Sequence, residues 1–298
     1  MLRHDCRTSS SYSVATVSTD RSRPARLSLA QLTIADANPL QLIDAAVAGG
    51  FDAICLRLVA PLPTDTVFPV VGQEPMIRDI AARLDASGIR ILDMEAIWLM
   101  PHTDVRSLMP AMELAARLGA QHVLVVGNDP DQGRLAANFA ALCDRADALG
   151  LGVVLEAMSF AELKTLRQTL DLLGRVRKPN ARLLVDALHF YRSGAHPREL
   201  AAIDPTLFPF MHLCDASLAA PPADGLKAEA RGGRFYPGEG ELALGDLLRA
   251  LPAGIPIEVE APCARYAGLP VLERARICGA ATRALMSGAF GRTAPQGR

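Results

Sequence analysis

Acidic and histidine side chains interrupt four otherwise apolar segments in the second half of the sequence. They are Glu156 in VVLEAM, Asp186 in LLVDALHF, His212 in FMHLCDA and Glu260 in IEVEAP. A buried carboxylate is costly without a compensating charge, and carboxylates that lie close together raise one another's pKa. A divalent cation would remove that conflict. Oxygen-rich ligands with one imidazole suit Mn²⁺, Mg²⁺, Co²⁺ or Fe²⁺, and Zn²⁺ is a further possibility.

A second glutamate, Glu258, precedes Glu260 by two positions, so the two side chains point to the same face of a strand. We expect only Glu260 to reach the cation, because it lies nearer the end of the strand. Glu258 is predicted to be a structural acid one layer deeper.

The elements that must position these residues follow a repeated strand-then-helix pattern that starts at Leu27. Short apolar or β-branched runs predict eight strands, at 27–34, 51–58, 90–99, 121–127, 151–158, 181–190, 209–216 and 255–261. Stretches with helical spacing predict eight helices, at 39–50, 76–88, 105–119, 134–150, 163–176, 197–203, 244–251 and 270–286. Several strands are apolar without alternation, which is typical of a parallel sheet with both faces covered.

Eight strand–helix units predict a single (β/α)8 TIM barrel over residues 27–290. A doubly wound sheet is the competing topology, but no G-x-G-x-x-G motif follows the first strand. Residues 1–26 are rich in Ser, Thr and Arg and are predicted to be a flexible tail, with an organelle transit peptide as the alternative. Residues 291–298 are assigned to a C-terminal tail. In a TIM barrel, chemistry occurs at the C-terminal ends of the strands, where the four polar residues fall.

Composition excludes several classes of function. The net charge is −1 and only 5% of residues are aromatic, so we expect no nucleic-acid partner. No apolar run reaches the length of a membrane span, so no membrane association is expected. The six cysteines lack C-x-x-C spacing and mostly lie in apolar runs, which favours buried free thiols in a cytoplasmic protein. The expected partner is a small-molecule substrate, and a homo-oligomer is possible.

Candidate substrate-binding residues lie near other strand ends. Arg57 ends the second predicted strand, and Glu95 and Trp98 lie near the end of the third. The long segment 217–241 is rich in Gly and Pro and carries Arg231 and Arg234, which could hold an anionic group of the substrate. Such a segment can act as a lid, and a solvated surface loop is the alternative.

The ordered set of VLEAM, the D-x-x-H of VDALHF, HLCD, PGEGE and EVEAP resembles the xylose-isomerase-like sugar phosphate isomerase/epimerase superfamily, over about residues 27–288. The resemblance implies that a divalent metal, with Mn²⁺ the expected ion, is held by Glu156, Asp186, His212 and Glu260. It further implies that Glu156 and Glu260 are the acid/base pair and that His189 contacts the substrate.

The expected reaction is proton abstraction next to a carbonyl of a sugar- or polyol-like substrate through a metal-stabilised enediolate, giving isomerisation or epimerisation. The alternative is a dehydratase acting on a 3-dehydroshikimate-like cyclic hydroxy-ketone acid. Members of that branch often have Gln where this chain has His212, which favours the isomerase. A DNA-repair role similar to endonuclease IV is a third possibility, but that branch uses three zinc ions and more histidines than the two at strand ends here.

Overall fold

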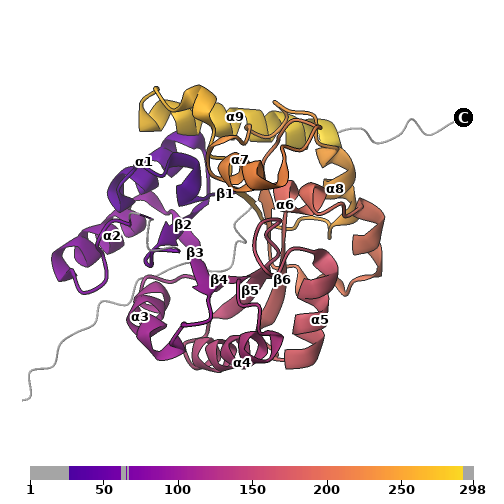
Figure 1. The fold of residues 1–298 in the computed structure, drawn as a ribbon. Helices are drawn as coiled ribbons and strands as arrows, with labels where there is room; N and C mark the ends of the chain where they lie inside the picture. The colour runs from indigo at the N-terminus through magenta and orange to yellow at the C-terminus, as the bar shows by residue number, and fades with distance from the viewer. Residues whose placement is uncertain (1–26, 62–64, 66, 291–298) are drawn as a thin grey trace, which may run out of the picture.

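Eight parallel strands pair in chain order and close into a barrel in the computed structural model, which describes residues 27–61, 65 and 67–290 (Figure 1). The strands are β1 (Leu27–Leu29), β2 (Ala53–Arg57), β3 (Arg90–Leu99), β4 (His122–Gly127), β5 (Gly152–Glu156), β6 (Ala181–Asp186), β7 (Met211–Leu213) and β8 (Ile257–Val259). The barrel closes where β1 pairs with β8. The predicted TIM barrel and its eight strands are therefore confirmed. The predicted tails, 1–26 and 291–298, lie outside the described residues.

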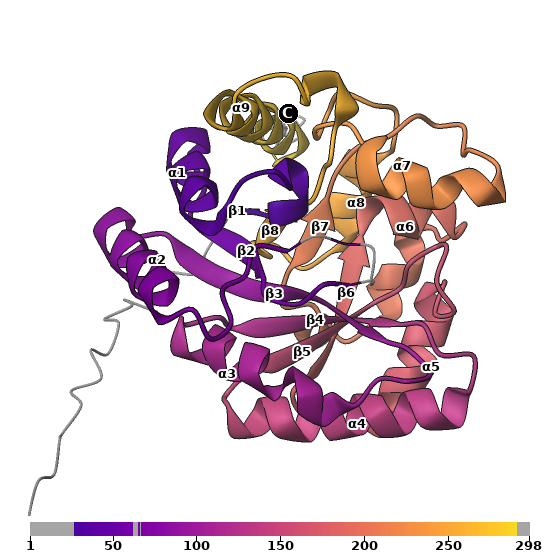
Figure 2. The ribbon, with the colours of Figure 1, turned by 60° about the vertical axis from the view of Figure 1, so that its left-hand side comes forward.

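Helices surround the strands on the outside of the barrel (Figures 1 and 2). They are α1 (Pro39–Gly49), α2 (Glu74–Ser87), α3 (Met109–Arg117), α4 (Gln132–Ala148), α5 (Leu166–Val176), α6 (Ala187–Arg192), α7 (Leu226–Gly232), α8 (Leu244–Ala250) and α9 (Val271–Phe290). One large apolar cluster packs between these helices and the strands, and a smaller one lies inside the barrel around Leu124, Val154 and Phe210.

Local sequence signals explain the helix ends. At the start of α1, the Asn38 side chain accepts a hydrogen bond from the Gln41 amide, and the Gln41 side chain accepts one from the Asn38 amide. This capping box satisfies two backbone donors that the helix itself cannot. After α1, Gly50 adopts a left-handed conformation with φ of 68°, which costs little without a Cβ.

Two predicted strands give way to a helical turn before their expected ends. The segment 27–34 is a strand only to Leu29, and 31–34 is a 3₁₀ turn whose Thr33 hydroxyl donates to the Val259 carbonyl at 2.8 Å. The segment 181–190 is a strand only to Asp186. The Asp186 side chain accepts a hydrogen bond from the His189 amide and so caps α6, which places His189 on a helix.

Two other segments also differ from the prediction. Residues 197–202 form a 3₁₀ helix rather than an α-helix. The segment 217–241 is not an open loop, because it contains α7, which contacts α6 through an ion pair between Arg192 and Glu229 (Figure 2).

The five cysteines within the described residues are buried and unpaired, as predicted. Cys6 lies outside those residues. No helix in the described part of the chain is long and apolar enough to cross a membrane.

The contact between α1 and α9 depends on two glycines, and the two helices lie side by side in both views (Figures 1 and 2). A Cβ at Gly279 of α9 would lie 2.1 Å from the Gly49 carbonyl oxygen, and a Cβ at Gly49 would lie 2.6 Å from the Ala275 carbonyl oxygen. Neither helix can therefore carry a larger residue at this crossing without separating from the other.

We expect Gly279→Ala to destabilise the protein by about 1–3 kcal/mol, because the added methyl group forces the two helices apart. Thermal unfolding should show a Tm lower by roughly 2–4 °C per kcal/mol. Gly288→Ala is the matched control in the same helix. Nothing lies within 4 Å of its added Cβ, so its Tm should be unchanged or higher. An equal Tm change in both variants would contradict the close crossing.

Candidate metal centre

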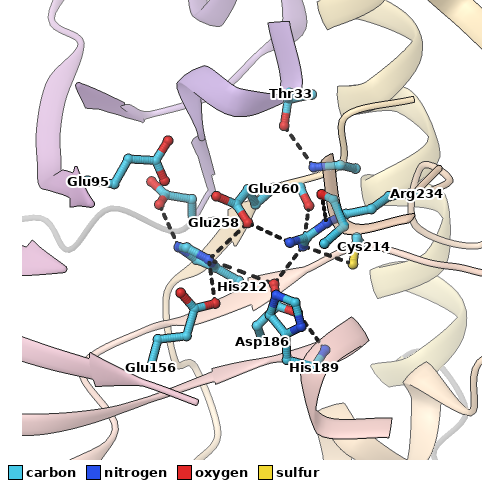
Figure 3. Close-up of polar contacts among 12 residues, drawn as sticks. Thr33, Glu95, Glu156, Asp186, His189, His212, Cys214, Arg234, Glu258 and Glu260 are labelled. Atoms are coloured by element: carbon cyan, nitrogen blue, oxygen red, sulfur yellow. Dashed lines mark hydrogen bonds and ion pairs between the residues drawn. The ribbon is translucent and has the colours of Figure 1, made fainter. Parts of the chain in front are cut away.

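Four side chains from consecutive strands converge at the C-terminal mouth of the barrel (Figure 3). Glu156 ends β5, Asp186 ends β6, His212 lies in β7 and Glu260 follows β8. One ligand atom from each lies within 4.8 Å of the others, and all four residues are buried. The Nδ1 atom of His212 is 3.9 Å from Glu156 Oε1, 3.9 Å from Asp186 Oδ2 and 3.7 Å from Glu260 Oε2.

Glu258 orients the histidine from below. Its Oε1 atom lies 2.9 Å from Nε2 of His212, and its Oε2 atom accepts a hydrogen bond from the Ser28 hydroxyl. When Nε2 of His212 carries the proton and donates a hydrogen bond to Glu258, the lone pair of Nδ1 faces the carboxylates of Glu156, Asp186 and Glu260. This is the usual arrangement for a histidine that binds a metal. The structure thus places Glu258 one layer deeper than Glu260, as predicted.

Arg234 supplies the positive charge inside the cluster. Its Nη1 atom donates to Asp186 Oδ2 at 2.7 Å and to the Glu260 carbonyl oxygen at 2.8 Å, and its Nη2 atom lies 2.9 Å from Glu260 Oε2. Nε donates to the Ala230 carbonyl oxygen of α7 at 2.9 Å. The side chain is 1% exposed. The guanidinium is engaged with protein oxygens, but Arg234 also lines the cavity beside the cluster, so its role in substrate binding stays a prediction.

The charges in the cluster shift its pKa values in different directions. Burial raises the pKa of Asp186, but Arg234 and the two neighbouring histidines outweigh it and lower the pKa to about 2. Burial raises the pKa of Glu156 well above its ordinary value, because Arg234 compensates it less. Burial lowers the pKa of His212, but the surrounding carboxylates outweigh it and raise the pKa well above its ordinary value. The cluster therefore attracts positive charge beyond what Arg234 provides.

Unpartnered atoms show that a metal ion fits these residues. Within the described part of the chain, Glu156 Oε1 and His212 Nδ1 are buried and have no hydrogen-bond partner, and the only cation beside Glu260 Oε2 other than His212 is Arg234. Buried polar atoms are rarely left unsatisfied, and oxygen donors with one imidazole nitrogen suit a divalent cation. His212 is the only histidine in any candidate metal cluster of the described residues, unlike the histidine-rich three-zinc site considered above.

His189 borders the same space from α6. Its Nδ1 atom lies 3.4 Å from the Ser159 amide nitrogen, which donates to it, and 3.1 Å from the Ser159 hydroxyl. An Nδ1 that accepts from a backbone amide carries its proton on Nε2, and Nε2 has no protein partner among the described residues. Burial lowers the pKa of His189 to about 4, so the ring is neutral and Nε2 is a hydrogen-bond donor.

A cavity open to solvent lies beside the cluster. Its lining includes Glu156, Glu260 and His189 together with Arg57, Trp98 and Arg231. Phe160, which follows β5, also lines it and packs edge-on against His189. The sequence analysis missed Phe160 and Ser159, although both directly follow the strand that carries Glu156.

The remaining predicted substrate residues are paired with each other or with distant acids. Arg57 Nε donates to Glu95 Oε1 at 3.1 Å, and Glu95 is buried next to the cluster. Burial raises the pKa of Glu95 to about 7 despite the charge of Arg57. Arg231 Nη2 donates to Asp65 Oδ2 at 2.8 Å. Their roles in substrate binding stay predictions, and an anionic substrate would have to compete with these carboxylates.

A family comparison agrees with this geometry. The model of the xylose isomerase-like TIM barrel family matches residues 43–285. The chain belongs to that family. A search of curated proteins gave no significant match.

Solved structures share the fold at low sequence identity. The IolI protein with a bound zinc atom is 19% identical, with a TM-score of 0.71, over 90% of this chain and 100% of that one. D-allulose 3-epimerase from Methylomonas sp. is 18% identical, with a TM-score of 0.63, over 89% and 98%. The probable 3-DHS dehydratase AsbF from Bacillus anthracis is 16% identical, with a TM-score of 0.66, over 87% and 98%.

A fusion of a xylose isomerase-like TIM barrel with a 4-hydroxyphenylpyruvate dioxygenase is 19% identical, with a TM-score of 0.74. The alignment includes 90% of this chain but spans only 43% of the fusion protein.

We expect Arg234→Met to destabilise the metal-free protein by about 3–5 kcal/mol, because it leaves two buried carboxylates without their cation. Urea unfolding in the presence of a chelator measures this loss. Added Mn²⁺ should restore part of it by replacing the missing charge. Arg249→Met, which breaks an exposed pair with Asp246, should leave the free energy of unfolding nearly unchanged. A variant as stable as the wild type in chelator would contradict the compensating role of Arg234.

Proposed function

We propose that this chain is a divalent-metal-dependent isomerase or epimerase that removes a proton next to a carbonyl of a sugar- or polyol-like substrate. The observation that carries the proposal is the convergence of four ligand atoms within 4.8 Å at the mouth of the barrel. The family contains enzymes of this kind, and one structural relative is an epimerase.

Glu156, Asp186, His212 and Glu260 would hold the cation, and Mn²⁺ is our expected ion from the donor set. When bound, the cation would polarise a substrate carbonyl and an adjacent hydroxyl and stabilise the negative charge that develops on proton removal. The zinc atom in the IolI structure supports a divalent metal in this fold.

The proton transfers are assigned to the two glutamates. Glu156 comes from β5 and Glu260 follows β8, three strands further around the barrel, so their carboxylates reach the cavity from different directions. One carboxylate removes the proton next to the carbonyl, and the other returns a proton to the opposite face or to the neighbouring carbon. The Nε2–H of His189 would donate to a substrate oxygen and hold the reacting carbon between them.

A dehydratase is the second candidate. Arg57 and Arg231 line the same space and would bind a substrate carboxylate in exchange for Glu95 or Asp65. The chemistry diverges only after the common proton abstraction, when a β-hydroxyl leaves instead of a proton returning. The structural relative described as a probable 3-DHS dehydratase supports this alternative.

We expect Glu156→Gln and Glu260→Gln each to lower kcat by at least about 10²–10⁴-fold, because each removes a proton-transfer group and a metal ligand. Incorporation of solvent deuterium into a panel of ketoses and cyclic hydroxy-ketones measures the activity. Incorporation without loss of water indicates an isomerase or epimerase, and a conjugated product that absorbs ultraviolet light indicates the dehydratase.

Glu273→Gln is the matched control, because Glu273 is exposed on α9, away from the barrel mouth. It should retain the wild-type rate. Near-native rates in both Glu156→Gln and Glu260→Gln would overturn the acid/base assignment.

If the protein is a dehydratase, we expect Arg231→Ala to raise KM for an acidic substrate by roughly 10–100-fold with little change in kcat. This is the effect expected from the loss of one charged hydrogen bond. The comparison is the same measurement with a neutral ketose, whose KM should not change. Unaltered KM for the acidic substrate counts against a substrate carboxylate at Arg231.

A further inference from the structure

A second group of potential metal ligands lies deeper in the barrel. Cys55 of β2, Asp93 of β3 and Glu258 of β8 each offer a ligand atom, and these atoms lie within 4.8 Å of one another. Cys55 and Asp93 are paired residues of neighbouring strands. All three are 0% exposed. The group is distinct from the four residues at the mouth and contains a thiol, which those residues lack.

Asp93 points to a missing ligand. In the part of the chain that the structure describes, no N–H or O–H group donates to either of its carboxylate oxygens, and the side chain at hydrogen-bonding distance is another carboxylate, that of Glu258. Glu258 is paired with His212, whereas no lysine or arginine of the described residues forms an ion pair with Asp93. A fully buried carboxylate with neither oxygen satisfied is costly, and it needs either a proton or a cation.

The acidic neighbours increase this need. Burial, together with the charges of Glu258 and Glu95, raises the pKa of Asp93 well above its ordinary value. Burial and the charge of Asp93 likewise raise the pKa of the Cys55 thiol. Glu258 is held in place by hydrogen bonds to His212 and Ser28, and all three side chains are fully buried.

We propose that Cys55, Asp93 and Glu258 bind a second divalent cation, and that it is a thiophilic ion such as Zn²⁺. Thiolate with carboxylate ligands selects Zn²⁺ over the hard ions Mg²⁺ and Mn²⁺. On binding, the Cys55 sulfur–hydrogen bond and the oxygen–hydrogen bond of protonated Asp93 break, the sulfur and carboxylate electron pairs form the bonds to the metal, and both protons are released to solvent. No electron is transferred, and neither the metal nor the sulfur is oxidised.

Complete burial gives this site a kinetic property that the mouth lacks. Glu156 and Glu260 line an open cavity, so a chelator can reach an ion there. An ion between β2, β3 and β8 can leave only when the barrel opens. The deep ion should therefore persist in a chelator long after the ion at the mouth has been removed.

Cobalt substitution of the full-length protein tests the proposal. Protein refolded with Co²⁺ should bind two ions per chain and show thiolate-to-cobalt charge-transfer absorption in the near ultraviolet. Cys55→Ser, which keeps the size of the side chain but removes the sulfur, should abolish that band and lower the cobalt content to one. Cys143→Ala, at a buried cysteine of α4, should keep both ions and the band.

Two more variants separate this site from the proposed active site. Asp93→Asn should weaken or abolish the charge-transfer band and leave the ion at the barrel mouth bound. Circular dichroism is the check that this variant is folded. Glu156→Gln should lose the ion at the mouth and keep the band. Two results would overturn the proposal: folded wild-type protein binds cobalt without the charge-transfer band, or the band persists in Cys55→Ser. In either case Asp93 shares a proton with Glu258 instead of binding a cation.

Discussion

The structure depends on one electrostatic constraint, the burial of several carboxylates at the mouth of the barrel with too little positive charge to neutralise them. Glu156, Asp186 and Glu260 face a single histidine ring across less than 4 Å. All three side chains are almost fully buried, so the protein must provide most of their hydrogen bonds and countercharge from its own residues. The neighbouring residues of the site are arranged to meet that need.

Arg234 and Glu258 meet it in complementary ways. Arg234 forms ion pairs with Asp186 and Glu260, whereas Glu156 has only His212 as a cationic neighbour among the described residues. Glu258 engages Nε2 of His212 and so turns Nδ1 toward the carboxylates. Arg234 and Glu258 thus hold the four ligand side chains in position before any ion binds. The carboxylates of the cluster still exceed the positive charge that Arg234 supplies. Preorganisation of this kind lets a site bind a cation without reorganising its ligands.

The sequence was sufficient to predict the barrel and the convergence of its polar strand ends. Apolar runs that end in Glu156, Asp186 and His212 recur at about the length of one strand–helix unit, and parallel strands of a barrel end at the same face. The layer difference between Glu258 and Glu260 followed from the two-residue periodicity of a strand.

The sequence did not predict contacts that depend on tertiary structure. The ion pairs of Arg234 with Asp186 and Glu260 were not predicted, because they form only when the segment 217–241, which contains α7, folds against the ends of β6 and β8. Arg231 pairs with Asp65, 166 positions away, and no local pattern signals such a contact. His189 was placed on a strand because the hydrophobic run continues past Asp186, whereas the capping hydrogen bond of Asp186 starts a helix there.

The central claim, that the four residues at the mouth share one divalent cation, is tested most directly by anomalous X-ray diffraction from crystals grown with Mn²⁺. The account predicts an anomalous peak bounded by Glu156, Asp186, His212 and Glu260, with Nδ1 of His212 directed at it. A well-ordered site without an anomalous peak, or manganese bound only elsewhere on the protein, would contradict the account.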